Sequence, residues 1–181
     1  AAVTATAVYD SAAALDRMLL EEYYKCYAWN KLYKRELFQQ IRYPEGRLFE
    51  DIPTTYQIFR QVKRVSFNPA SHYRIRAGSI TAGKFQQKTY DMMIPIRHIL
   101  SESKSDTMNL GCMLYTLYFI DNMIQGGVWD KEIYSFYREH MKHIPKTAFS
   151  QVSRQRKLQM QLCYRCAPLY RMVYTLLARG R

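Results

Sequence analysis

Hydrophobic residues recur at helical spacing throughout the second half of the chain. One apolar stripe runs from Leu110 to Ile124, and Gly126-Gly127 follows it, as glycine commonly does at the end of a helix. Asp130 is placed to cap the next helix, whose apolar residues follow the i, i+3, i+4, i+7 pattern from Ile133 to Ile144. Pro145 should stop that helix, so the pattern predicts two consecutive helices.

Two further helical segments are predicted around this pair. The segment from Gln87 to Leu100 has helical spacing, with a kink or restart expected at Pro95. A basic segment from about Ser150 to Ala178 has similar spacing and should be interrupted near Pro168. We therefore expect the chain to be all helical from Phe85 onward.

The first half of the chain shows shorter patterns. A helix is predicted from Ser11 to Tyr24, with Asp10 or Ser11 as its cap, and a second, short helix is predicted from Lys31 to Gln39. A proline and a glycine favour a loop from Ile41 to Gly46.

The next segment predicts a helix followed by strands. Asp51 is expected to be the N-cap of a helix that has Pro53 in its first turn and runs to about Lys63. The alternating segments Arg64 to Phe67 and Ser71 to Arg76 are then predicted to be short strands.

Together these elements predict a mainly α fold with a small β element, which is too few strands for a complete α/β domain. We divide the chain into residues 1–84, which contain the β element, and residues 85–181, which are helical and basic. Residues Ala1 to Ala7 show no structural pattern, and because the chain does not begin with Met we expect its natural start to lie upstream.

Basic charge is concentrated near the end of the chain. The formal net charge is +12, and the 42 residues after Glu139 contain nine Lys or Arg and no acidic residue. Such a segment is expected to bind a polyanion. Residues 154–181 combine these cations with leucines and tyrosines, which fits either a helix lying on an anionic membrane surface or a packed helix with a solvated basic face.

The cysteines and the hydropathy predict a cytoplasmic location. The chain has four cysteines and opens with no signal peptide, so we expect a reducing cytoplasm without disulfides. No apolar run approaches the roughly 18 residues that cross a bilayer. We therefore expect a cytoplasmic protein that can be peripheral on the inner face of the cell membrane.

The most specific part of the sequence lies between Trp29 and Ile80. Its blocks are Trp29 to Phe38 (WNKLYKRELF), Arg42 to Gly46 (RYPEG), Phe49 to Tyr56 (FEDIPTTY) and Tyr73 to Ile80 (YRIRAGSI). In this order and spacing they resemble the C-terminal half of bacterial family 2 glycosyltransferases of GT-A fold, which assemble capsules, exopolysaccharides and other surface glycans. The resemblance covers roughly Leu15 to Thr81.

This resemblance implies an inverting transfer of a sugar from a nucleotide-sugar donor to a glycan or lipid-linked acceptor. In such enzymes an N-terminal half binds the nucleotide, and its D-x-D motif holds Mg²⁺ or Mn²⁺ against the donor diphosphate. No Asp-x-Asp occurs in this chain. We therefore expect residues 1–84 to be the acceptor-side half of such an enzyme, with the metal ligands elsewhere, and this chain to be inactive alone.

The catalytic base is expected in the pair Glu50-Asp51. An inverting transfer needs one carboxylate within hydrogen-bond reach of the acceptor hydroxyl. Adjacent residues of an extended segment point to opposite faces, so only one of the pair should face the acceptor, and the family pattern favours Asp51. A purely structural role for Asp51, as a helix cap, is the alternative.

Five residues are predicted to bind substrate. Arg74 and Arg76 would share one face of a strand and suit a diphosphate, and Ser79 would add a hydroxyl or an amide; the alternative is a solvated strand face. Trp29 and Lys31 would line the acceptor pocket, unless the indole is part of the core and the lysine pairs with a carboxylate.

The sequence leaves a metal site and a binding module as alternatives to consider beside the enzyme. His140, His143, Cys163 and Cys166 form pairs, but a zinc site needs four ligands at motif spacing, so we predict reduced, packed cysteines. The alternative to an enzyme is a basic helical module that binds a membrane surface or nucleic acid without catalysis. No nucleic-acid-binding motif is evident, which disfavours nucleic acid as a partner.

Overall fold

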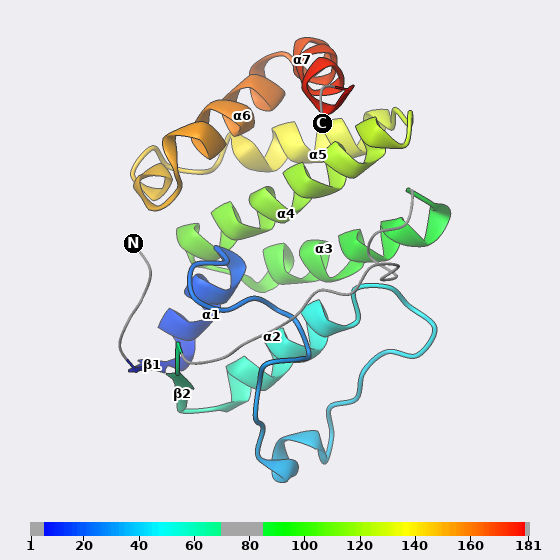
Figure 1. Cartoon of the computed structure of the whole chain (residues 1–181). Coiled ribbons are helices and arrows are strands. Elements are labelled where there is room, and N and C mark those ends of the chain that lie inside the picture. Colours follow the sequence, from blue (N-terminus) through cyan, green and yellow to red (C-terminus); the bar gives the residue numbers. More distant parts are fainter. Residues whose placement is uncertain (1–5, 70–84, 180–181) are drawn as a thin grey trace. The chain divides into compact units, whose positions relative to one another are not determined.

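The computed structural model describes residues 6–69 and 85–179, apart from the side chains of 178 and 179. The chain divides into two compact units, Ala1–Gly83 and Lys84–Arg181, and each is described by itself (Figure 1). In the described residues the fold is mainly helical with one small sheet.

The sheet of the first unit has two antiparallel strands. β1 (Ala7–Asp10) pairs with β2 (Arg64–Phe67) in a register that places Ala7 opposite Phe67 and Asp10 opposite Arg64. β2 confirms the strand predicted there. β1 was not predicted, because its four residues alternate only between exposed and half-buried positions, and the pairing with β2 defines the strand. The other predicted strand, Ser71 to Arg76, lies outside the described residues.

The helix α1 (Ser11–Leu19) packs on this sheet, and α1 and α2 (Asp51–Gln61) pack on each other. α1 is capped by Asp10, whose carboxylate accepts a hydrogen bond of 2.8 Å from the Ala13 amide. The Ser11 hydroxyl donates to the Phe59 carbonyl of α2 at 2.7 Å. α1 ends before the predicted Tyr24, because the backbone turns away where Glu21 adopts a positive φ of 55°.

A long connection joins α1 to α2. The helix predicted from Lys31 to Gln39 is wrong except for the 3₁₀ turn η1 (Arg35–Phe38). Asn30 has a φ of 61°, which a right-handed helix excludes, and the Lys31 side chain bonds the preceding backbone. The loop predicted from Ile41 to Gly46 is present, and Gly46 supplies a φ of 72°.

The second unit is built around α4 (Asp106–Gln125), as Figure 1 shows. This helix contacts α3 (Met93–Glu102), α5 (Lys131–Met141), α6 (Arg154–Arg165) and α7 (Ala167–Arg179). Because it has neighbours on several sides, most of its residues are buried.

The ends of these helices match the sequence pattern closely but not fully. Gly126 is the C-cap of α4 and Asp130 is the N-cap of α5, as predicted. The predicted helix from Gln87 to Leu100 begins instead as the 3₁₀ turn η3 (Gln87–Met92), and Pro95 lies in the first turn of α3, where its missing amide proton costs little.

The basic segment forms two helices rather than one. A 3₁₀ turn, η4 (Ala148–Gln151), precedes α6, and Cys166 separates α6 from α7. The predicted interruption near Pro168 is therefore confirmed, since Pro168 stands in the first turn of the new helix.

Polar contacts hold α7 on the unit. The Tyr170 hydroxyl donates a buried hydrogen bond of 2.5 Å to the Asp121 carboxylate of α4. The Arg171 guanidinium lies 5.0 Å from the centre of the Trp129 ring, which itself stacks on Tyr134 at 4.1 Å. In the described part of the chain, no helix combines the length and the hydrophobicity that spanning a lipid bilayer requires.

Candidate functional site

The predicted base Asp51 is the first residue of α2, and Glu50 occupies the N-cap position. The expectation that Asp51 is the N-cap is therefore wrong. The expected extended backbone is also wrong, because Glu50 has helical dihedral angles, φ −64° and ψ −19°. Side chains of successive helical residues diverge by about 100° rather than pointing to opposite faces. Both carboxylates are half-buried.

A residue with positive φ directly precedes two of the predicted site residues. Phe49, directly before Glu50, has a φ of 59°, and Asn30, directly before Lys31, has a φ of 61°. Asn tolerates this left-handed region, but a residue as bulky as Phe pays about 1–2 kcal/mol there. Backbone strain of this kind clusters at ligand-binding and active sites, so the strain at Phe49 supports a functional site at the pair Glu50-Asp51.

The surroundings of Asp51 change its acidity. Burial raises the pKa of this carboxyl above its ordinary value, and the negative charge of Glu50 raises it further. Backbone amide hydrogen bonds and the positive charge of Lys31 act in the opposite direction, but they do not outweigh burial. The Asp51 carboxylate is therefore a stronger proton acceptor than an exposed aspartate.

Lys31 is held within the loop that precedes η1. Its ammonium group donates to the carbonyl oxygens of Lys25 and Tyr27, both at 2.6 Å, and to Asn30 Oδ1 at 3.3 Å. Burial lowers the pKa of Lys31, against the opposing effect of Asp51. The lysine thus fixes the loop and places a positive charge within electrostatic reach of the candidate base.

Two tyrosines that were not predicted as site residues interact near Asp51: Tyr43 is within electrostatic reach of its carboxylate, and Tyr33 lies beside Tyr43. Burial raises the pKa of Tyr33 to about 12, and the hydroxyls of Thr55 and Tyr43 are close enough to affect it. The Tyr33 hydroxyl nevertheless has no partner of good hydrogen-bond geometry among the described residues. Burial also raises the pKa of Tyr43, and the charges of Asp51 and Glu50 add to this effect.

The sequence offered one signal for these tyrosines. Tyr33 belongs to the WNKLY block and Tyr43 to the RYPEG block, so both lie inside the segments that carry the family resemblance. Spacing alone could not find them, because the long connection between α1 and α2 determines which residues meet.

Trp29 is 37% exposed and stacks on Tyr27, with 4.8 Å between ring centres and 24° between planes. Because the indole is exposed, the alternative that Trp29 is part of the core is wrong. An exposed indole supported by a second ring is a suitable platform for a sugar ring. Its role in acceptor binding stays a prediction.

The predicted diphosphate-binding residues Arg74, Arg76 and Ser79 lie outside the described residues. Of the predicted residues that the structure describes, Lys31 and Glu50 lie within electrostatic reach of Asp51, and Trp29 lies on the connection between α1 and α2, two residues before Lys31.

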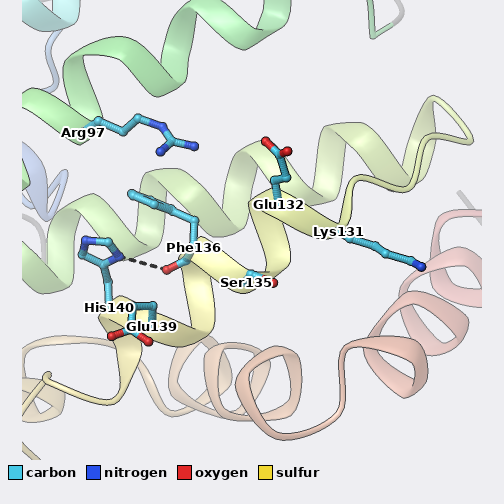
Figure 2. Close-up of a pocket in the computed structure, with 7 residues that line it drawn as sticks. All are labelled: Arg97, Lys131, Glu132, Ser135, Phe136, Glu139 and His140. Carbon is cyan, nitrogen blue, oxygen red and sulfur yellow. Dashed lines mark hydrogen bonds between the residues drawn. The ribbon is translucent and has the colours of Figure 1, made fainter.

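The second unit has a surface cleft of its own, with a volume of about 530 Å³. Figure 2 shows Arg97 of α3 facing Phe136 and His140 of α5, while Lys131 extends away from them. The Arg97 guanidinium lies 4.5 Å from the Phe136 ring centre, and His140 Nδ1 donates to the Phe136 carbonyl at 2.9 Å.

This cleft offers no clear chemistry. Its cationic side chains are offset by two carboxylates, Glu132 and Glu139, and Glu139 is paired with Lys142 at 2.5 Å. No residue predicted as catalytic or substrate-binding lines it. We assign it no function.

Over residues 6–69 and 85–179, no three or more His, Cys, Asp or Glu side chains are grouped so that they could hold a metal ion. Cys163 is buried and Cys166 is exposed, and both are free thiols.

Comparisons of the chain with protein-family models, with curated proteins and with solved structures each found no match.

Proposed function

We propose that this chain is the acceptor-side half of an inverting family 2 glycosyltransferase of GT-A fold. The complete enzyme would transfer a sugar from a nucleotide-sugar donor to a glycan or lipid-linked acceptor in bacterial surface-polysaccharide synthesis. One observation carries the proposal. Asp51, which the family pattern favours as the base, is half-buried at a helix start with a raised pKa, and Lys31 of the WNKLY block lies within its electrostatic reach.

In the proposed reaction, an acceptor hydroxyl binds within hydrogen-bond distance of the Asp51 carboxylate. The carboxylate accepts the hydroxyl proton while the oxygen attacks the anomeric carbon from the side opposite the nucleotide diphosphate. The carbon–oxygen bond to the diphosphate then breaks, and the configuration at the anomeric carbon is inverted. No second protein acid is required, because a diphosphate is a good leaving group once its charge is neutralised.

The neighbouring residues would position the acceptor and the base. Lys31 fixes the loop that carries Trp29, and the exposed indole would stack on an acceptor sugar ring. The Tyr33 and Tyr43 hydroxyls would donate hydrogen bonds to the carboxylate or to the acceptor. Arg74, Arg76 and Ser79 stay proposed diphosphate contacts on the strength of the sequence alone.

The family resemblance places a Mg²⁺ or Mn²⁺ ion on the donor-binding half, where it would neutralise the leaving diphosphate. The described residues of this chain provide no group of three ligands for such an ion, so no step proposed here passes through it.

The proposal is tested by joining a nucleotide-binding half of a family 2 glycosyltransferase to the N-terminal side of this chain and mutating the base. Sugar transfer from nucleotide-sugar donors should fall about 10²- to 10⁴-fold in Asp51→Asn, which is the usual contribution of general-base catalysis. Glu45→Gln removes an exposed carboxylate from the neighbouring loop and should leave the rate unchanged. Full transfer activity in Asp51→Asn would refute the assignment.

Stability measurements separate catalysis from a structural role. Because the pKa of Asp51 is raised in the fold, its charged form is disfavoured there, and this residue's contribution to stability declines as pH rises through its titration. Asp51→Asn should therefore unfold at the same or a higher urea concentration at neutral pH. A clear loss of stability would indicate that Asp51 serves the helix rather than the reaction.

A further inference from the structure

The net positive charge of the second unit comes from its final segment. Residues 84–139 contain six Lys or Arg and seven Asp or Glu, whereas residues 140–181 contain nine Lys or Arg and no acidic residue. This final segment forms α6 and α7, which pack against each other at the top of Figure 1. α6 and α7 are therefore strongly cationic and carry no acidic residue.

The outward side of α7 is apolar. Tyr170 faces the unit and is buried, whereas Leu169, Met172 and Leu176 are 41%, 55% and 63% exposed. At 100° per residue these three side chains fall within about 60° of one another on the helix surface, opposite the buried face. Met172 and Leu176, together with Pro168, Arg171 and Thr175, line a shallow groove of about 360 Å³. Exposed apolar faces of this kind mark interaction surfaces.

The neighbouring helix α6 combines exposed cationic side chains with an exposed apolar one. Leu158 is 63% exposed, and Arg154 and Arg165 are exposed at positions that share its side of the helix, four residues before it and seven after it. An apolar strip beside exposed arginines is characteristic of helices that lie in the interface of an anionic membrane. A protein partner would need an acidic surface with a matching apolar ridge, whereas an anionic bilayer supplies both properties over any area.

We propose that α6 and α7 bind the surface of an anionic phospholipid bilayer. The side chains of Leu169, Met172 and Leu176 enter the boundary between headgroups and acyl chains, and the arginines of α6 contact lipid phosphates. Lipid phosphates attract each nearby arginine or lysine, and burial of the leucines and methionine adds an apolar contribution. This proposal rests on α6 and α7 alone and holds whether or not Asp51 is a catalytic base.

Vesicle co-sedimentation of the whole chain tests the proposal. Vesicles of phosphatidylcholine mixed with phosphatidylglycerol should pellet the protein, and vesicles of phosphatidylcholine alone should not. Binding should weaken as salt is raised, since the headgroup attraction is screened. Equal binding to both kinds of vesicle, or to neither, would contradict the proposal.

Matched variants locate the binding surface. The double variant Met172→Ser, Leu176→Ser should weaken binding to anionic vesicles by about tenfold or more, as expected for two partly buried apolar side chains. Ile94→Ser removes a comparably exposed side chain, 47% exposed, from α3 and should bind as the parent does. Circular dichroism confirms that each variant is folded.

Two matched variants that each remove one positive charge complete the test. Arg165→Gln should weaken vesicle binding and reduce its salt dependence, whereas Lys104→Gln, an exposed cation before α4, should do neither. Two results would assign the surface to another occupant and overturn the proposal. One is a concentration-dependent dimer that Met172→Ser abolishes. The other is duplex DNA binding that is tighter than vesicle binding and insensitive to the double variant.

Discussion

Asp121 is the residue whose ionisation should influence stability most directly. It lies buried in α4 and accepts the hydrogen bond from Tyr170 of α7. Burial raises its pKa to about 7, although the Tyr170 hydrogen bond and the charge of Arg156 act in the opposite direction. An ordinary aspartate has a pKa of 3.8. The folded chain therefore holds this proton over a pH range in which the unfolded chain has released it.

This difference predicts the sign of a pH effect. Between about pH 4 and pH 7 the folded state binds more protons than the unfolded state at this site, so its contribution makes stability fall as pH rises, by at most about 4 kcal/mol. Above pH 7 the effect levels off. Asp121→Asn stays neutral and still accepts from Tyr170, so it should be more stable than the parent at pH 8 and similar at pH 5.

The measurement is urea unfolding of parent and variant at both pH values. Asp106→Asn, which alters an exposed carboxylate at the start of the same helix, should retain the pH dependence of the parent. A parent and an Asp121→Asn variant with the same pH dependence would show that Asp121 does not titrate in this range.

The sequence could indicate single candidate site residues, but not the contacts that surround them. The motif blocks indicated Asp51 and Lys31, and the structure places these two within electrostatic reach of each other. It could not indicate that Lys31 bonds two backbone carbonyls, that Tyr43 lies within electrostatic reach of both carboxylates, or that Tyr33 lies beside Tyr43. Such contacts depend on the path of a long loop, which no periodic pattern encodes.

Among the helices, α5 depends most clearly on its first residue. The Asp130 carboxylate accepts from the amides of Glu132 and Ile133 through one oxygen and from the Tyr90 hydroxyl, at 2.8 Å, through the other. The same side chain therefore caps α5 and holds η3 against it.

Substitution can separate these two roles. Asp130→Ala should lower the free energy of unfolding by about 2–3 kcal/mol, because it removes both the cap and the Tyr90 hydrogen bond. Asp130→Ser retains a capping oxygen and should lose about 1 kcal/mol less. Thermal and urea unfolding measure both values, and equal losses in the two variants would contradict a capping role.

The elements that the sequence predicted best are those with strong local signals. α4 and α5 combine an apolar stripe with a cap residue, and both were predicted within a few residues of their ends. β1 was missed because a four-residue edge strand has no periodicity long enough to detect. The short helix from Lys31 to Gln39 failed because left-handed Asn30 and the bonds of Lys31 to preceding carbonyls override its helical spacing.

The second unit should fold without the first. Its fully buried side chains come from α3, α4, α5 and α6, and all of these helices contact α4 or one another. The largest of these side chains are Ile96, Ile99, Leu110, Met113, Leu117, Phe119, Ile120, Met123 and Tyr137. A core of this size is sufficient for a domain of about 100 residues.

A fragment of residues 84–181 tests this expectation. It should retain a helical circular dichroism spectrum and melt in one cooperative transition. The fragment of residues 1–83, which has fewer buried residues among those that the structure describes, provides the comparison. A broad, non-cooperative melt of fragment 84–181 would show that its core needs the rest of the chain.

The contact of Arg171 with Trp129 has an optical consequence. The chain has two tryptophans, so replacing Trp29 with Phe leaves Trp129 as the sole indole fluorophore. Its emission depends on a guanidinium that α7 supplies and on the stacked ring of Tyr134. Detachment of α7 would remove the cation and hydrate the indole, so the emission maximum would shift to the red. The helix that we propose to be membrane-bound thus carries, in its own packing, a spectroscopic signal of whether it stays docked when lipid is added.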